Sequence, residues 1–217
     1  MEQFVFGVDL DGVCGDYTTA FRTIVARELG VAEDDLPTER SWDFNEWNLE
    51  AAGGFERLHA LAVTEHHMFA DMPPIEGVAD ALWRLSDAGI WIRVITHRLY
   101  VNWGHATSVA DTVMWLDNNR IPYRDICFLG NKPDVGANVY VDDGPHNITA
   151  LRGAGHEAII FDQPYNRHLS GLRAADWAEV EEIVMEMAAD RTGGMQPQLP
   201  GVDAGSARLD RRRDGDD

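Results

Sequence analysis

The residues with the clearest chemical potential are two pairs of aspartates, each placed directly after an apolar run. Asp9 and Asp11 follow the run at 4–8, and the adjacent pair Asp142 and Asp143 follows the run at 139–141. In an extended chain residues two apart point to the same side, so Asp9 and Asp11 can face one site. Carboxylates this close repel one another unless a cation or a shared proton lies between them. Mg²⁺ prefers a few hard oxygen ligands of this kind, so the pattern indicates a magnesium site.

A hydroxyl and an ammonium group follow two further apolar runs. Thr96 comes directly after residues 91–95, and Lys132 lies in the loop after residues 126–129. Taken alone, Thr96 is typical of a strand end or a helix cap, and Lys132 of a solvated loop. At the ends of neighbouring strands, however, both groups could hold phosphoryl oxygens and stabilise their charge.

The elements that must position these groups alternate between strand and helix patterns. Strands are expected near 3–9, 91–95, 126–129, 139–141 and 158–161, with helices between them. Such alternation with short connections predicts a parallel sheet covered by helices on both faces, a three-layer Rossmann-like α/β sandwich. Ligands of open α/β sheets bind at the carboxyl ends of the strands, where the aspartates fall.

Helical patterns fill the segment after the first strand, and Pro73-Pro74 marks the boundary beyond which strand–helix alternation begins. We expect residues 17–72 to form a small helical cap inserted after the first strand, and residues 1–16 and 73–190 to form the catalytic core. Residues 191–217 are rich in Gly, Pro, Asp and Arg, which predicts a disordered tail.

Composition narrows the classes of partner. The formal net charge of −19 argues against binding a nucleic-acid polymer, which requires a basic face. No stretch approaches the ~20 apolar residues of a membrane span, and no secretory signal is recognisable. Two cysteines do not make a disulfide framework, so we expect a cytoplasmic protein. The oligomeric state stays open, a homodimer included.

Several aromatic residues of the expected cap could contact a substrate. Trp42, Phe44 and Trp47 lie in a turn-rich segment, and aromatic rings can stack a nucleobase for ~1–3 kcal/mol each. The alternative is that these rings form the hydrophobic core of the cap. Arg98, two residues after Thr96, could add a phosphate or base contact or could be a surface arginine.

The order of these motifs resembles the haloacid dehalogenase superfamily of phosphatases. The resemblance rests on residues 9–13, residues 95–98, Lys132 and residues 141–143, and it covers roughly residues 4–165. The 5′(3′)-deoxyribonucleotidase branch is the most similar, in length and in the gap from Lys132 to Asp142.

The resemblance implies a role for each matching residue. Asp9 would attack phosphorus and become an aspartyl phosphate, and Asp11 would serve as general acid and then base. Phosphoryl oxygens would be held by Thr96, His97 and Lys132. Mg²⁺ would be bound by Asp9, the Asp11 carbonyl and the Asp142-Asp143 pair.

The expected function is hydrolysis of a small phosphomonoester, with a nucleoside monophosphate as first choice. A sugar phosphate or another small metabolite is an alternative substrate for the same chemistry. A non-catalytic nucleotide-binding protein is the third hypothesis. The simultaneous presence of Asp9 and Asp11 argues against it, because binding alone needs only one of the two carboxylates.

Overall fold

The computed structural model describes residues 3–100 and 103–192, and a six-stranded sheet forms its centre. The strand order is β3-β2-β1-β4-β5-β6, and every neighbouring pair is parallel. The strands are β1 (Val5–Val8), β2 (Trp91–Thr96), β3 (Asp125–Phe128), β4 (Val139–Asp142), β5 (Ala158–Phe161) and β6 (Arg173–Ala174). The chain order reverses at β1, so β1 and β4 border the crevice where such sheets bind ligands.

Side chains that alternate along the strands point to opposite faces of the sheet, so the hydrophobic core has two parts. Val8 and Val141 belong to a large cluster that includes apolar residues of α4 (Val78–Asp87), α5 (His105–Asn118) and α7 (Trp177–Thr192). Tyr140 and Ile160 belong to a smaller cluster with α6 (Pro145–Gly153) on the other face. Helices therefore cover both faces of the sheet, which confirms the predicted three-layer α/β fold.

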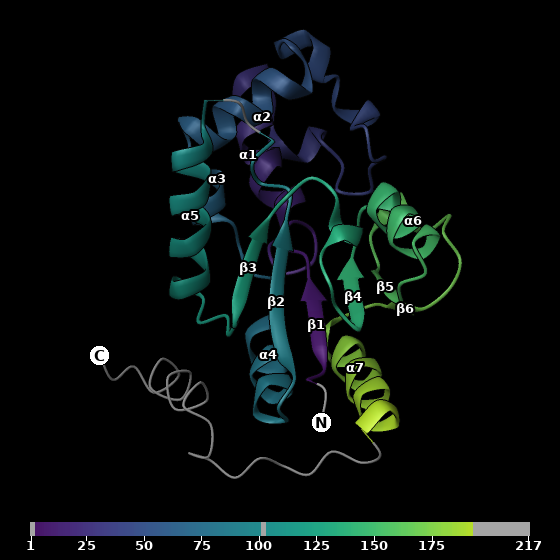
Figure 1. Ribbon diagram of the computed structural model, residues 1–217. Helices are drawn as coiled ribbons and strands as arrows, with labels where there is room; N and C mark the ends of the chain where they lie inside the picture. Colours follow the sequence, from purple (N-terminus) through teal and green to yellow (C-terminus); the bar gives the residue numbers. More distant parts are fainter. Residues whose placement is uncertain (1–2, 101–102, 193–217) are drawn as a thin grey trace.

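The predicted cap lies between β1 and β2 in sequence and above the carboxyl ends of the strands in space (Figure 1). Its regular elements are α1 (Tyr17–Leu29), η1 (Glu33–Asp35), η2 (Asn45–Trp47), η3 (Leu49–Ala52), α2 (Gly54–Thr64) and α3 (Met68–Asp71). Asp16 caps α1 by accepting a hydrogen bond from Thr19 N, and Gly30 ends the helix in the left-handed conformation.

Backbone hydrogen bonds join the two segments that connect the cap to the core. Asp16 N donates to Pro73 O at 2.8 Å, and Ile75 N donates to Cys14 O at 2.7 Å. These bonds satisfy backbone groups that would otherwise be left unpaired at the crossing of the two connections. The division of the chain at 16/17 and 72/73 stays a prediction, and residues 193–217 of the predicted tail lie outside the described residues.

No helix within the described ranges, 3–100 and 103–192, is long and apolar enough to cross a membrane.

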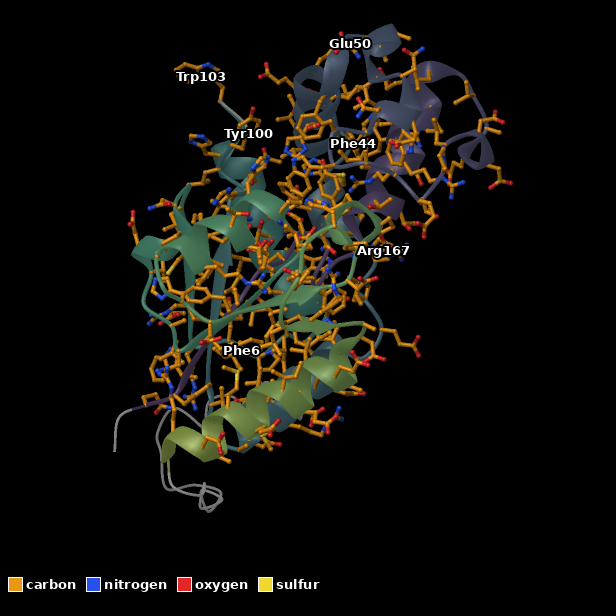
Figure 2. All side chains as sticks on the ribbon, turned by 90° about the vertical axis from the view of Figure 1, so that its right-hand side faces the viewer. Phe6, Phe44, Glu50, Tyr100, Trp103 and Arg167 are labelled. Carbon is orange, nitrogen blue, oxygen red and sulfur yellow. The ribbon has the colours of Figure 1, made fainter. Side chains whose placement is uncertain are left out.

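Side chains fill the space between the layers throughout. Figure 2 shows Phe6 inside the core and Phe44 inside the cap.

Gly7 provides a test of how tightly the centre of the sheet is packed. A Cβ at this position would lie 2.8 Å from Tyr140 Cδ1 and 2.9 Å from Ile95 Cδ1. We expect Gly7→Ala to lower the free energy of unfolding by about 1–3 kcal/mol, because the central strand cannot move away from both neighbours. Urea unfolding measures the change. Gly153→Ala, which meets no atom within 4 Å, is the matched control and should not destabilise the protein.

Candidate active site

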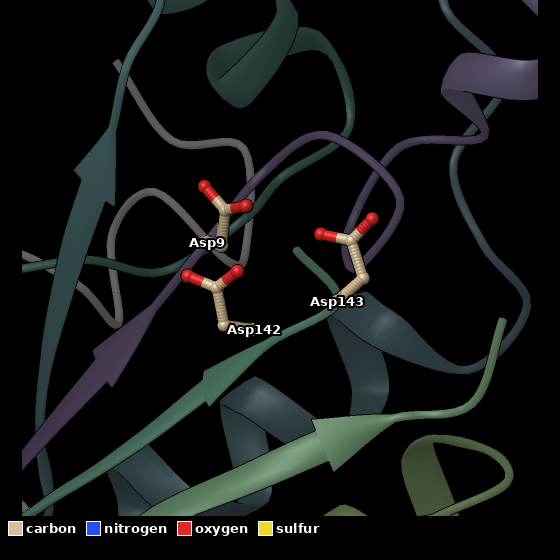
Figure 3. A group of neighbouring side chains, drawn as sticks. All are labelled: Asp9, Asp142 and Asp143. Atoms are coloured by element: carbon tan, nitrogen blue, oxygen red, sulfur yellow. The ribbon is translucent and has the colours of Figure 1, made fainter. Parts of the chain in front are cut away.

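Three aspartates meet where β1 and β4 end. Val8 of β1 pairs with Val141 of β4, so Asp9 and Asp142, which directly follow these residues, leave the sheet side by side. One carboxylate oxygen from each of Asp9, Asp142 and Asp143 lies within 4.8 Å of the others, and all three residues are buried (Figure 3). The two acidic segments recognised in the sequence therefore form one cluster.

Lys132 supplies the positive charge at this cluster. It is 3% exposed, at the start of η4 (Lys132–Asp134), and its Nζ lies 2.7 Å from Asp9 Oδ1 and 2.6 Å from Asp142 Oδ2. Burial alone would lower the pKa of Lys132, but Asp142 and Asp9 outweigh it and raise the pKa. The ammonium group thus stays charged and bridges the ends of β1 and β4.

One ammonium group does not balance three buried carboxylates. Burial, with Asp142 and Asp11 adding to it, outweighs Lys132 and raises the pKa of Asp9 to about 7. Burial, followed by the charges of Asp9 and Asp142, raises the pKa of Asp143 well above its ordinary value. This excess of negative charge, presented by hard oxygen ligands in a small volume, fits a divalent cation such as Mg²⁺.

The hydrogen bonds of the two neighbouring aspartates differ. Both oxygens of Asp142 are occupied: Oδ2 by Lys132, and Oδ1 by Gly144 N at 2.9 Å and Asn147 Nδ2 at 3.0 Å. Asp143 accepts one hydrogen bond, from the Tyr165 hydroxyl to Oδ2, and within the described part of the chain its Oδ1 accepts none. Asp143 is therefore the better placed of the two to bind a cation directly.

Gly12 makes room for Asp143. Its φ is +79°, and a Cβ added there would lie 2.3 Å from Asp143 Oδ2. Any other residue at position 12 would displace this carboxylate as well as strain the turn.

Asp11 forms an ion pair with Arg98. The distance from Arg98 Nη2 to Asp11 Oδ1 is 2.7 Å, and Nε lies 3.1 Å from the same oxygen. Arg98 is 2% exposed, and its guanidinium lies over the Phe69 ring at 4.2 Å. Arg98 is thus not a surface arginine: it lines the cavity above the aspartates with its guanidinium paired to Asp11, and its contact with substrate stays a prediction.

Thr96 and His97 end β2 next to the cluster but have different environments. Thr96 is fully buried and does not line the cavity above the cluster; its hydroxyl accepts a long hydrogen bond from Arg98 N. His97 lines the cavity, where burial, followed by the charge of Lys132, lowers its pKa.

A cavity of about 620 Å³ opens above the aspartates and extends beneath the cap. Its floor includes Asp9, Asp11, Lys132 and Asp143, and its walls are largely aromatic. The aromatic rings that line it are those of Tyr17, Trp42, Phe44, Phe55, Phe69, Tyr100 and Tyr165, and the imidazoles are those of His59, His97 and His146.

The three cap aromatics singled out in the sequence are placed differently. Trp42 and Phe44 line the cavity, whereas Trp47 does not. Trp47 is 1% exposed, packs 4.9 Å from the Phe44 ring and donates its indole hydrogen to Pro37 O. Trp47 therefore belongs to the hydrophobic core of the cap, the alternative considered for these rings.

Sequence reasoning missed the loop after β5, which also ends at this edge of the sheet. Gln163 Nε2 donates to Gly12 O at 2.8 Å, and Asn166 Nδ2 donates to Asp143 O at 2.9 Å. The available signal was topological, since every parallel strand delivers its following loop to the same edge. These loop residues carry no charge and form no recognisable motif.

Arg40 and His59 of the cap were also missed. Arg40 lines the cavity and is 6% exposed. His59 Nδ1 lies 2.9 Å from the Tyr17 hydroxyl, and burial lowers the pKa of His59 to about 4, so the imidazole is neutral.

The raised pKa of Asp9 predicts that cation binding at this cluster depends on pH. Because Mg²⁺ competes with a proton at Asp9, its affinity should fall by about tenfold per pH unit below pH 7 and level off above it. Calorimetric titration from about pH 5 to about pH 8, in two buffers of different ionisation enthalpy, also measures the protons released. Asp80→Asn, an exposed carboxylate on α4, should keep this profile. Mg²⁺ binding without proton release near pH 6 would contradict the assignment.

Comparison with solved structures shows which fold carries this site. The fold matches a haloacid dehalogenase superfamily hydrolase from Geobacter sulfurreducens with a TM-score of 0.53 and 15% identity, over 84% of this chain and 96% of the other. A haloacid dehalogenase-like hydrolase from Xanthomonas campestris matches with a TM-score of 0.55 and 14% identity, over 88% and 94% of the two chains. These similarities establish the haloacid dehalogenase fold.

Sequence comparison is more specific. A Chlorobaculum tepidum protein, provisionally named as a 5′(3′)-deoxyribonucleotidase, is 44% identical over 84% of this chain and 90% of its own length. A 5′(3′)-deoxyribonucleotidase of Clostridium acetobutylicum is 25% identical over 84% of this chain and 96% of its own length. The profile of one family matches residues 3–190. With the matching fold and the aspartate cluster, this shows that the chain belongs to the 5′ nucleotidase, deoxy (pyrimidine), cytosolic type C family.

Proposed function

We propose that this protein is a magnesium-dependent phosphatase of nucleoside monophosphates, with deoxyribonucleotides as preferred substrates. One observation carries the proposal: three buried carboxylates, two of them bridged by Lys132, lie at a cavity whose walls are largely aromatic. The floor suits a phosphoryl group beside a cation, and the walls suit a nucleobase. Family membership and the names of the relatives support the same substrate class.

Asp9 is the proposed nucleophile. Its carboxylate oxygen attacks phosphorus, the bond to the ester oxygen breaks, and an aspartyl phosphate remains on the enzyme. Asp9, the Asp11 carbonyl and Asp143 would hold the cation, which would supply positive charge against the phosphoryl oxygens. Lys132 adds a fixed positive charge beside the reacting carboxylate and holds Asp9 in position through its contact with Oδ1.

Asp11 is the proposed general acid and base. In the first step it gives a proton to the departing ester oxygen, which leaves as the nucleoside hydroxyl. In the second step it takes a proton from the water that attacks the aspartyl phosphate, and inorganic phosphate is released. Because Asp11 is paired with Arg98, the carboxylate must exchange this contact for the substrate oxygen during the reaction.

The remaining contacts are assigned by their position in the cavity. His97 lines the cavity and could donate to a phosphoryl oxygen. Thr96 is fully buried at the end of β2 and is proposed to hold this end in place. Trp42 and Phe44 are the proposed stacking partners of the base. The neutral His59 and the Tyr17 hydroxyl form a polar pair within the otherwise apolar wall, where a base edge could bond. We place the enzyme in the cytoplasm with the rest of the nucleotide pool.

A panel of phosphomonoesters tests the substrate class. We expect magnesium-dependent phosphate release from deoxynucleoside monophosphates at a kcat/KM at least about tenfold above that of deoxyribose 5-phosphate, because the latter lacks the base that the aromatic wall would stack. Asp9→Asn should reduce release from every substrate to background. Equal rates with sugar phosphates would point to the alternative substrate class, and binding without turnover to a non-catalytic protein.

The role of Asp11 can be tested with a substrate whose leaving group needs no acid. With p-nitrophenyl phosphate, Asp11→Asn should release a burst of p-nitrophenol equal to the enzyme concentration. Steady turnover should then be slower by about 10²–10⁴-fold, because no base activates water in the second step. Asp9→Asn is the control and should give no burst. Wild-type turnover by Asp11→Asn would remove this residue from the acid–base role.

A further inference from the structure

The loop between β5 and β6 holds two of the segments that form the cation site. The loop comprises residues 162–172, and its first half contains the turn η5 (Pro164–Asn166). Gln163 and Asn166 hydrogen-bond to backbone carbonyls on either side of the site, at Gly12 and Asp143 respectively. Asn166 is fully buried and also donates to Phe161 O at 2.8 Å, so the loop is fixed to the end of its own strand.

Tyr165, the central residue of this turn, contacts the cation site through its hydroxyl. The hydroxyl donates to Asp143 Oδ2, and the residue is 7% exposed. This bond fixes the rotation of the Asp143 carboxylate and leaves Oδ1 available beside Asp9 and Asp142. A hydrogen bond of this kind orients a metal ligand in many proteins, where its loss typically weakens metal binding 10- to 100-fold.

The ring of the same tyrosine contacts the cap. The guanidinium carbon of Arg40 lies 4.4 Å from the centre of the Tyr165 ring, and the Trp42 ring packs edge-on at 5.4 Å. Arg40 also lies 3.8 Å from the centre of the Phe44 ring. One guanidinium therefore contacts a ring of the cap and a ring of the core.

Among the described residues no carboxylate forms an ion pair with Arg40, so the aromatic rings are its main partners besides two oxygen acceptors. Its hydrogen bonds go to Thr18 Oγ1 and to Ser41 O, and among the ion pairs of the described residues none involves Arg40. A guanidinium removed from water without a counterion gains more from an aromatic face than an exposed one does. A second contact, Arg167 Nη1 to Glu39 Oε2 at 3.0 Å, joins the same segments at their exposed border, where Arg167 is labelled in Figure 2.

We propose that Tyr165 is a positioning residue that couples the cation site to the cap: its hydroxyl orients Asp143, and its ring holds Arg40 and Trp42 over the cavity. A cation that fixes Asp143 also fixes Tyr165 and so favours the docked position of residues 39–42. By thermodynamic reciprocity, docking of this segment favours cation binding to the same extent. The proposal rests on the proposed function only for the identity of the cation.

The first experiment separates the hydroxyl from the ring. Tyr165→Phe keeps the contacts with Arg40 and Trp42 but loses the hydrogen bond to Asp143. Calorimetric titration of the full chain with MgCl₂ should give a Kd raised about 10-fold or more. At saturating Mg²⁺ the KM for a deoxynucleoside monophosphate should return close to that of the wild type. Tyr123→Phe, at the opposite edge of the sheet, controls for the loss of a tyrosine hydroxyl and should leave the Kd unchanged.

The second experiment measures the coupling itself, without substrate. In the wild type, saturating Mg²⁺ should slow amide hydrogen exchange in residues 39–47. In Tyr165→Leu, which removes both hydroxyl and ring, saturating Mg²⁺ should leave exchange in this segment unchanged. Tyr165→Leu should also raise KM at saturating Mg²⁺, which Tyr165→Phe should not.

The outcomes separate this inference from the proposed function. An unchanged Mg²⁺ Kd in Tyr165→Phe, or cap exchange that ignores Mg²⁺ in the wild type, would overturn the coupling even if the enzyme hydrolyses nucleotides. Retained coupling in a protein that hydrolyses no nucleoside monophosphate would leave this inference intact and overturn the proposed substrate. A wild type that binds no Mg²⁺ would overturn both.

Discussion

The Lys132 ammonium, held between Asp9 and Asp142, is the contact on which the rest of the site depends. It lies within 2.7 Å of a carboxylate at the end of each of two neighbouring strands, and it is almost completely buried. Without it, like charges removed from water at adjacent strand ends would repel one another. With it, the cluster still carries excess negative charge, which favours a cation and which, added to burial, raises the pKa of Asp9. Lys132 therefore does two things: it reduces the repulsion between carboxylates at the sheet edge, and it supplies positive charge where phosphoryl chemistry needs it.

The chain is acidic overall, but its cavity contains buried cations. An acidic composition is therefore compatible with an anionic substrate. Within the cavity, Lys132 and Arg40 are buried cations, and Arg98 neutralises Asp11. All three cations are almost completely buried, so each of these charges acts more strongly than it would on the surface. The same rings line the cavity and pack the interior of the cap, as the contact between Phe44 and Trp47 shows. Substrate recognition and cap stability are consequently not independent properties.

Much of the fold and part of the site could be predicted because they depend on local pattern. Apolar runs that stop at acids predict strands with acids at their carboxyl ends, and parallel order brings those ends to one edge. This reasoning places Asp9 and Asp142 at the same edge of the sheet, where the structure has them side by side. It did not separate Trp42 from Trp47, because both are cap tryptophans in one turn-rich segment. Nor did it find Tyr165, since an uncharged residue in a loop carries no signal of what its hydroxyl contacts.

Apart from the short strand β6, the sequence by itself determined the strands, and hence the α/β fold and the location of the aspartate cluster. Backbone geometry dictates these features: side chains alternate along a strand, and parallel strands share a direction. Only the tertiary structure decided that Arg98 pairs with Asp11, that Asp143 keeps an oxygen free where Asp142 does not, and that the cap rests on Tyr165. Those contacts join residues far apart in the chain, and their geometry follows from how the cap and the loops pack together. Packing of this kind is a property of the whole fold, and no local pattern of residues encodes it.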